Sequence, residues 1–367
     1  MIRSVTLKNF RGLDSLTVPL NSATMLTGIN GVGKTSVLEG LYCLFSNTRL
    51  DVAPLSRYNK SQGLAPYTHV GMPFNLAARQ TYNYKLFWDE CPIYGCGTCS
   101  VEAASTHYTW HWQYQKGKYN DLDKDMIINN MVHVDAATEF ALWQWDKKGE
   151  SETITTRRAQ VLNPDGGLYL LPIESDYFSM CQYIDFSTIS LQPTKLSFQT
   201  AKQLTKALQI LNPKITDVRL KDIDSGLSVI VSDKYEVSLS TIGNGAVTWA
   251  SALISIFELV DLLKLQEEEK LPVFVLFDEM GSGIHYSIML EIWDYLKKFL
   301  EQNKNIQFVF NSHSDDCIRA FCEAFRQTKN ASIVRLHQSA NNSGIIPTEY
   351  TSDEFENIIA GEWEVRG

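Results

Sequence analysis

A glycine-rich segment that ends in a lysine and a threonine is the part of this sequence best equipped for chemistry. Residues 28–35 read GINGVGKT and fit the pattern G-x-x-x-x-G-K-[ST] at every position. Glycines let the backbone curl until several N–H groups point at one anion, and the start of a following helix adds partial positive charge there. The pattern therefore predicts a phosphate-binding loop in a nucleotide-binding protein.

Two side chains of this loop receive specific roles. Lys34 is expected to reach the β- and γ-phosphates, and Thr35 is expected to place its hydroxyl on Mg²⁺. Because such a loop fits a kinase, a GTPase or a motor equally well, residues at the ends of other buried strands must decide among these classes. The residues predicted to contact the nucleotide here are Asn30, Gly31, Gly33, Lys34, Thr35 and Ser36.

Two adjacent carboxylates follow a hydrophobic run. Residues 271–277 read LPVFVLF, which is typical of a buried strand in a parallel sheet, and Asp278 and Glu279 come directly after it. We interpret Asp278 as the partner of Mg²⁺ and Glu279 as the base that orients or activates the attacking water. The pair indicates hydrolysis rather than transfer to a second substrate. The alternative is a strand that merely ends in solvated acids.

A histidine follows the next hydrophobic run. Residues 306–310 read IQFVF and are predicted to form a buried strand, which is followed by Asn311, Ser312, His313 and Ser314. Ligands of open α/β sheets lie at the carboxyl ends of the strands. His313 is therefore expected to donate a hydrogen bond to the γ-phosphate or to the attacking water, with a purely structural histidine as the alternative.

A second loop of small residues precedes a long apolar helix that is predicted at 246–265. Residues 238–245 read SLSTIGNG, so this loop forms a second helix N-terminus that favours an anion. One chain hardly needs two phosphate sites, so the loop is expected to cover the γ-phosphate held by another copy of the protein. The alternative is a flexible turn. The contacting residues predicted there are Ser240, Gly243, Asn244 and Gly245.

The periodicity of apolar residues predicts the elements that position these motifs. Near-alternation of aromatic and polar residues over 101–160 is typical of an antiparallel sheet, and a strand, the glycine-rich loop and an amphipathic helix follow one another over 22–44. Further strands are expected at 2–7, 16–20, 218–220 and 227–231, and further helices at 195–211, 286–300 and 316–327.

With these residues in place, the chain resembles the ABC-type ATPases of the AAA family that are related to RecF, SMC and OLD-family heads. The resemblance implies an α/β fold of the P-loop NTPase, ABC-ATPase type, with a mostly parallel core sheet, an antiparallel β-subdomain and a helical or irregular insertion. It assigns residues 1–46 and 236–367 to the ATPase core, and 47–235 to the β-subdomain and the insertion, or helical lobe. The motifs that carry it are KNFRG at 8–12, the loop at 28–35 with Ser36, LSTIGNG at 239–245, Asp278-Glu279 with GIH at 283–285, and NSHS at 311–314.

The resemblance also implies an activity and partners. Members bind ATP and Mg²⁺ and hydrolyse ATP to ADP and phosphate. Two heads usually close face to face over two ATP molecules, so a homo-oligomer, at least a dimer, is expected. The Gly-Asn-Gly form of the signature is similar to that of stand-alone prokaryotic members, among them the ATPase subunits of PARIS- and Septu-type anti-phage systems, where a separate nuclease gene supplies the effector. OLD-like relatives often carry a nuclease after the ATPase, and none is expected here because the chain ends at Gly367.

The resulting hypothesis is an ATP-driven switch that controls a nuclease effector encoded nearby. One alternative is a RecF-like, ATP-dependent clamp on DNA, and another is a protein for which ATP is only a structural ligand. The sequence shows no long heptad arms, which counts against an SMC-type tether.

Composition narrows the class of protein further. The net charge of −9 gives no support to nucleic-acid binding, although a local basic groove stays compatible with it. The sequence contains neither an apolar run of about eighteen residues nor a secretory leader, so we expect a cytoplasmic protein without a membrane partner. Seven cysteines without an export signal favour reduced thiols over a disulfide framework.

Three cysteines with two histidines nearby form a candidate metal site. Cys91, Cys96 and Cys99, with His107 or His111 as a fourth ligand, match the donor types of a zinc site, and their spacing also resembles part of an iron–sulfur ligand run. The fourth ligand lacks the usual spacing for either. A cysteine-containing loop without a metal is the alternative.

Overall fold

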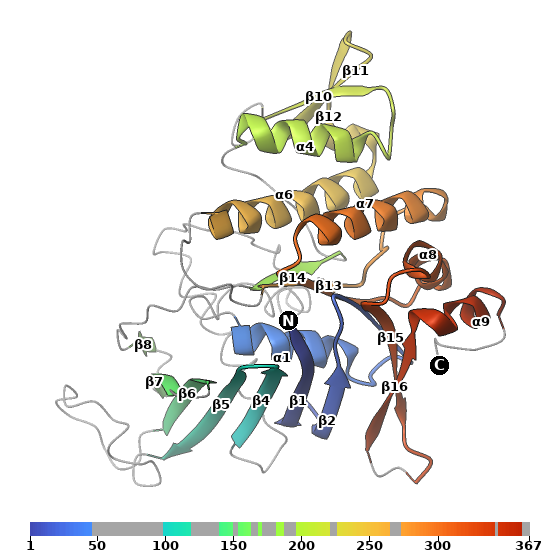
Figure 1. Ribbon diagram of the computed structural model, residues 1–367. Helices are drawn as coiled ribbons and strands as arrows, with labels where there is room; N and C mark the ends of the chain where they lie inside the picture. The colour runs from blue at the N-terminus through green and yellow to red at the C-terminus, as the bar shows by residue number, and fades with distance from the viewer. Residues whose placement is uncertain are drawn as a thin grey trace.

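The computed structural model describes residues 1–45, 98–118, 139–149, 153–162, 168–170, 181–186, 196–220, 226–264, 273–341 and 344–361. Within these ranges the strands form a six-stranded sheet, a seven-stranded sheet and a three-stranded sheet. Figure 1 shows them as layers separated by helices.

The six-stranded sheet is the parallel core. Its order is β16-β15-β3-β14-β13-β9, and every neighbouring pair is parallel except β15 and β16. All residues of β3, β13 and β14 are buried, which explains why most of their side chains are apolar. The strands are β3 (Ala23–Thr27), β9 (Cys181–Asp185), β13 (Val273–Asp278), β14 (Ile306–Asn311), β15 (Ala331–Gln338) and β16 (Ile345–Thr351).

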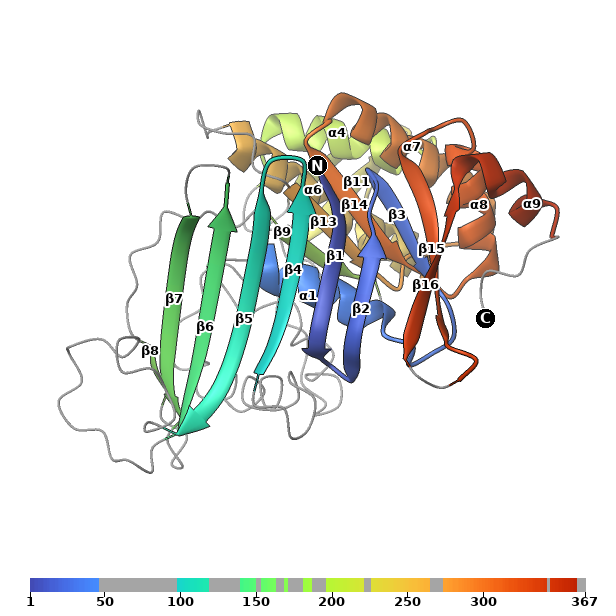
Figure 2. The same ribbon diagram turned by 60° about the horizontal axis from the view of Figure 1, so that its bottom comes forward.

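The seven-stranded sheet is antiparallel and confirms the sheet predicted over 101–160. Its order is β2-β1-β4-β5-β6-β7-β8, and Figure 2 shows these strands side by side. Trp110, Trp112 and Tyr114 alternate with less buried polar residues, so one face of the sheet packs inward. The strands are β1 (Ile2–Phe10), β2 (Leu13–Pro19), β4 (Thr98–Ser105), β5 (Thr109–Lys118), β6 (Glu139–Lys148), β7 (Thr153–Leu162) and β8 (Leu168–Leu170).

Helix α1 (Lys34–Phe45) lies between these two sheets. The predicted helix is present, but it is not amphipathic as expected, because every residue of α1 except Thr35 is buried. The helix packs against core-sheet residues such as Leu276 on one side and antiparallel-sheet residues such as Val101 on the other. Gly40 permits close approach to β1, since a Cβ there would lie 2.7 Å from Leu7 Cδ2. A helix covered on both sides has no polar face to show in its sequence.

The remaining helices cover the other face of the core sheet. Apolar residues of α6 (Asn244–Lys264), α7 (Met289–Gln302) and α8 (Asp315–Phe325) form one buried cluster with that face. Helix α4 (Phe198–Leu208) packs outside α6, and the small sheet packs on α4 (Figure 1). The small sheet contains β10 (Ile215–Leu220), β11 (Leu227–Val231) and β12 (Tyr235–Ser238), and the short helices are α5 (Leu239–Ile242), η4 (Tyr286–Ile288), η5 (Ser352–Glu354) and α9 (Phe355–Ile359).

Most predicted elements have counterparts within a few residues of their expected ends, whereas the strands β8, β9, β12, β15 and β16 were not predicted. The helix expected at 286–300 begins with the 3₁₀ turn η4 before α7 starts. The division of the chain at residues 46 and 236 remains a prediction about domains. In the sheets, β1 and β2 pair within the antiparallel sheet and β9 joins the parallel core. None of the helices in the described ranges is long and apolar enough to cross a membrane.

Candidate functional site

The glycine-rich loop connects β3 to α1 and takes a backbone path that glycine favours. Gly28, Gly31 and Gly33 have φ values of 127°, 81° and 104°. A Cβ on Gly28 would lie 2.2 Å from the carbonyl oxygen of Leu336 in β15, a distance that no side chain tolerates. The predicted strand–loop–helix arrangement of a phosphate loop is therefore present, with its backbone wrapped at the carboxyl end of a central strand.

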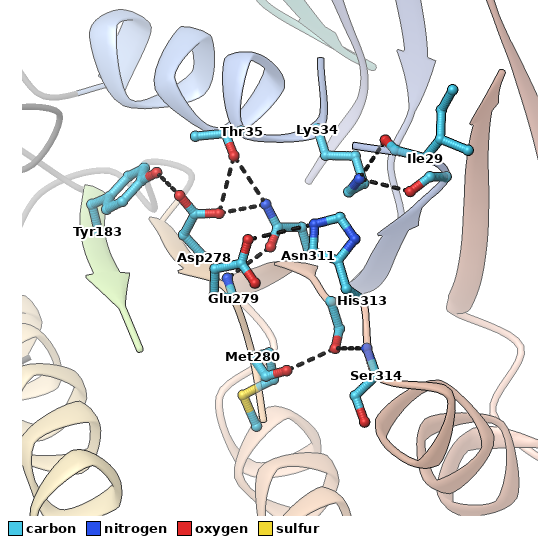
Figure 3. Close-up of polar contacts among 12 residues, drawn as sticks. Ile29, Lys34, Thr35, Tyr183, Asp278, Glu279, Met280, Asn311, His313 and Ser314 are labelled. Atoms are coloured by element: carbon cyan, nitrogen blue, oxygen red, sulfur yellow. Dashed lines mark hydrogen bonds and ion pairs between the residues drawn. The ribbon is translucent and has the colours of Figure 1, made fainter. Parts of the chain in front are cut away.

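Lys34 folds back over this loop. Its Nζ donates to the carbonyl oxygens of Gly28 at 2.7 Å and Ile29 at 2.9 Å (Figure 3). Burial lowers the pKa of Lys34 to about 8, and the nearby carboxylates of Glu279 and Asp278 oppose that shift. Lys34, Asp278 and Glu279 were predicted from separate motifs, and they lie close enough to interact electrostatically.

The ends of two parallel strands deliver side chains to the same side of the core sheet. Asp278 ends β13 and Asn311 ends β14, and the residues two positions earlier, Leu276 and Val309, face the buried cluster that contains α1. Side chains two residues apart share a face of a strand. Asp278 and Asn311 therefore project toward the start of α1, where Thr35 lies.

The carboxylate of Asp278 is held at both oxygens. Thr35 Oγ1 donates to its Oδ1 at 3.2 Å, the side-chain amide of Asn311 also donates to Oδ1, and Tyr183 Oη donates to Oδ2 at 2.6 Å (Figure 3). Burial raises the pKa of Asp278, whereas the hydrogen bonds from Tyr183 and Asn311 lower it. A hydroxyl and a carboxylate together form an oxygen-only donor set of the kind that Mg²⁺ takes, so Thr35 and Asp278 fit the predicted metal.

The predicted base and histidine face each other. His313 Nε2 lies 3.5 Å from Glu279 Oε1, and the two side chains are 36% and 40% exposed. Burial, and then the charge of Lys34, lower the pKa of His313 below its ordinary value of 6.5, which favours the neutral imidazole at pH 7. Glu279 has a φ of 56°, in the left-handed region that non-glycine residues rarely adopt.

Two residues of this site received no role from the sequence. Asn311 lies two residues before His313 in the segment 311–314, and its position directly after the apolar run 306–310 could have predicted its place in the site. Tyr183 gave no signal, because only the pairing of β9 with β13 brings it to Asp278. Burial raises the pKa of Tyr183, and the hydrogen bond that its hydroxyl donates to Asp278 raises this pKa further.

The signature-like loop lies apart in the fold, next to the segment after β13. Gly243 has a φ of 133° and separates α5 from α6, and a Cβ on Gly245 would lie 2.5 Å from the carbonyl oxygen of Gly283. Ser240 and Asn244 are exposed. The role of these four small residues toward a nucleotide stays a prediction.

The candidate zinc site is not supported. Cys91 and Cys96 lie outside the described residues, and Cys99 is a buried thiol in β4. Cys99 pairs with Tyr114, three residues from His111 along β5, so Cys99 and His111 point to opposite faces of the sheet. His111 instead lies 3.5 Å from Asp146. Within the described ranges, no three His, Cys, Asp or Glu side chains are grouped as metal ligands.

Fold and site together define the class of protein: the chain has an α/β fold of the P-loop nucleotide-binding type, in which a mostly parallel core sheet lies beside an antiparallel sheet. Residues 1–131 match the sequence model of a family described as AAA ATPase domain.

Particular proteins are similar to this chain over different extents. The DNA replication and repair protein RecF of Acholeplasma laidlawii (strain PG-8A) is 49% identical over 43 residues, which are 11% of this chain and 12% of that protein. The match therefore spans only a small part of either protein. A solved structure described as the recombination mediator protein RecF-ATPrS in the RecFOR pathway aligns over 96% of this chain and 98% of its own, with 8% identity and a TM-score of 0.43.

Proposed function

We propose that this protein binds ATP with Mg²⁺, hydrolyses it, and thereby switches between separate and self-associated forms that control a nuclease effector in prokaryotic anti-phage defence. The observation that carries the nucleotide part is the meeting of three distant segments at one sheet edge. Thr35 and Asp278 lie 3.2 Å apart across 243 residues of sequence, and Glu279 and His313 lie beside them (Figure 3).

Each residue has a task that its environment supports. Lys34 exchanges the carbonyl oxygens of Gly28 and Ile29 for phosphate oxygens, because a charged partner holds an ammonium better than neutral carbonyls do. Mg²⁺, when bound, neutralises charge on the β- and γ-phosphates. Glu279 accepts a proton from the attacking water, and His313, neutral at pH 7, donates a hydrogen bond toward the γ-phosphate.

The hydrolysis claim is tested by replacing Glu279 with glutamine. The amide keeps the shape of the side chain but does not accept the proton, so turnover should fall by about 100-fold or more while ATP still binds. The variant should accumulate ATP-loaded assemblies on size-exclusion chromatography with light scattering. Glu291→Gln on α7, an exposed residue outside the site, is the matched control. Unchanged turnover of Glu279→Gln would remove the claim.

The effector claim rests on the likeness of residues 239–245 to stand-alone prokaryotic ATPases. Its test is co-purification with the product of each adjacent gene, followed by a nuclease assay with ATP, without nucleotide, and with Glu279→Gln. We expect a partner whose nuclease activity changes with the nucleotide state. Nuclease activity that is the same in all three conditions would count against control by ATP.

A RecF-like clamp on DNA is the second candidate, and the RecF segment that is 49% identical over 43 residues favours it. The net charge of −9 favours the first candidate, because bulk electrostatics then oppose a phosphate backbone. DNA affinity that rises with ATP and falls steeply with salt would select the clamp. Assembly that depends on ATP and is indifferent to DNA would select the switch.

A further inference from the structure

One buried amide at the end of β14 contacts three residues of the proposed hydrolytic site. Asn311 is completely buried. Its Oδ1 accepts a hydrogen bond from the backbone N–H of Glu279 at 2.7 Å, and its Nδ2 donates to Asp278 Oδ1 and to Thr35 Oγ1, the latter at 3.4 Å. Figure 3 shows the amide between the start of α1 and the end of β13. A single side chain therefore joins the phosphate loop, the metal carboxylate and the base.

The chemistry of these contacts requires an amide in one orientation. The carboxylate of Asp278 needs a donor, and the backbone of Glu279 needs an acceptor, and an asparagine offers both on one planar group. A flipped amide would place its NH₂ against the N–H of Glu279 and its oxygen against the carboxylate. The carboxylate of Asp278 and the backbone N–H of Glu279 thus determine the orientation of the Asn311 amide, and the amide in turn holds both groups in place.

Glu279 is the residue that most needs such support. Its φ of 56° places it in the left-handed region, so its side-chain direction depends on whatever stabilises that backbone. Two hydrogen bonds from this segment end on Asn311: the N–H of Glu279 on the side-chain oxygen, and the N–H of Met280 on the backbone oxygen at 2.8 Å. Ser312, the residue after Asn311, adds a third hydrogen bond to this segment, because its Oγ donates to the carbonyl oxygen of Met280 at 2.7 Å.

We propose that Asn311 is a positioning residue that sets Glu279 for attack on the γ-phosphate and at the same time orients Asp278 and Thr35 toward Mg²⁺. The proposal rests on the ATPase function proposed above. Asn311 acts through its neighbours and needs no contact with the nucleotide. Its amide couples metal binding to base placement, so disturbing one disturbs the other.

The chain offers a matched control on the same strand. Gln307 is also completely buried, and it faces the same side of β14 as Asn311 because the two are four residues apart. Its side-chain amide forms hydrogen bonds with the backbone of Ile2 and Asn21, outside the site. Asn311→Leu and Gln307→Leu each replace a buried amide with an apolar side chain of similar size. A role limited to folding predicts similar behaviour from both variants.

The experiment measures three quantities for each variant: thermal stability, ATP affinity with EDTA and with Mg²⁺, and the single-turnover rate of hydrolysis. For Asn311→Leu we expect unchanged affinity in EDTA, loss of the gain in affinity from Mg²⁺, and a rate lowered by about 100-fold, the effect of a misplaced base. Gln307→Leu should keep the rate and the Mg²⁺ response. Tyr183→Phe, which removes only the hydrogen bond to Asp278 Oδ2, should need more Mg²⁺ to reach half of its maximal rate.

The proposal is overturned if Asn311→Leu hydrolyses ATP and responds to Mg²⁺ like the unmodified protein, or if Gln307→Leu loses both to the same degree. Should Asn311→Leu not fold, Asn311→Ala is measured in the same way, and a normal rate and Mg²⁺ response of that variant would overturn the proposal. If the unmodified protein binds ATP with Mg²⁺ but does not turn it over, the proposed hydrolysis fails. The Mg²⁺ response of the variants then decides the role of Asn311 separately.

Discussion

Lys34 is held by opposing forces in this site. Burial disfavours its charge, whereas two carbonyl oxygens and the carboxylates of Asp278 and Glu279 favour it. The balance leaves its pKa at about 8, far below the ordinary value of 10.5. The lysine that must meet the phosphates therefore titrates close to the physiological range.

This pKa predicts how ATP affinity depends on pH. Phosphates favour the charged lysine, so binding should take up close to one proton at pH 9 and none at pH 7, and affinity should weaken about tenfold per pH unit above 8. Calorimetric titration at pH 7, 8 and 9 in two buffers of different ionisation enthalpy measures both effects. Lys34→Arg, whose guanidinium stays charged, should show neither, and a flat profile for the unmodified protein would contradict the assignment.

The turn between β1 and β2 is fastened to α1 by a buried ion pair. Arg11 and Gly12 have φ values of 54° and 82°, the pattern of a hairpin turn in which arginine is uncommon. The guanidinium nevertheless reaches Glu39 with Nε at 3.1 Å and Nη2 at 3.3 Å, and both side chains are almost fully buried. The KNFRG segment thus braces the helix that begins at Lys34.

Removing one member of this pair should cost more than removing both. Arg11→Met removes the guanidinium that pairs with the buried carboxylate of Glu39 and should lower the free energy of unfolding by about 3 kcal/mol. Arg11→Met with Glu39→Leu should recover most of that loss. Chemical denaturation of the two single variants and the double variant measures the coupling. Losses that simply add would show that the pair does not act as a unit.

The first glycine of the phosphate loop is fixed by its neighbour in β15. Gly28→Ala meets both an unfavourable φ and the carbonyl oxygen of Leu336, so we expect loss of ATP binding with severe destabilisation. Gly12→Ala is the control, because its φ is also positive but nothing lies within 4 Å of the added Cβ. It should cost only about 1 kcal/mol. Equal melting temperatures of the two variants would contradict this account.

Across the whole molecule, the parallel sheet separates two buried clusters. One lies between this sheet and the antiparallel sheet around α1, and the other lies under α6, α7 and α8. The phosphate loop belongs to the first side, whereas the signature-like loop belongs to the side of α6. Ser240 and Asn244 are exposed, an arrangement that suits a partner copy.

The proposed self-association therefore predicts a separation of effects. Asn244→Arg adds bulk and charge to this exposed loop and should abolish the ATP-dependent dimer of the Glu279→Gln protein while ATP binding by the monomer stays unchanged. Light scattering after size exclusion, paired with calorimetry, measures the two properties. Gln203→Arg on α4 is a control at another exposed position. A dimer that survives Asn244→Arg would exclude this loop from the interface.

The amino-acid sequence was enough to predict which side chains gather at the candidate nucleotide site. A phosphate loop is encoded by local backbone requirements, and the two acids and the histidine follow short apolar runs that are typical of buried strands. For that reason Lys34, Thr35, Asp278, Glu279 and His313 were all predicted, and the structure brings them together.

Tertiary structure alone decided which other residues complete the pocket. Tyr183 reaches Asp278 because β9 pairs with β13, and Glu39 is buried because α1 lies between two sheets. Neither fact follows from periodicity, since strand order and the number of covered faces depend on contacts between segments far apart in the chain. Asn311 is the clearest example. Its place at the end of a strand could be predicted, but its side-chain partners lie at the end of β13 and at the start of α1, which only folding brings together.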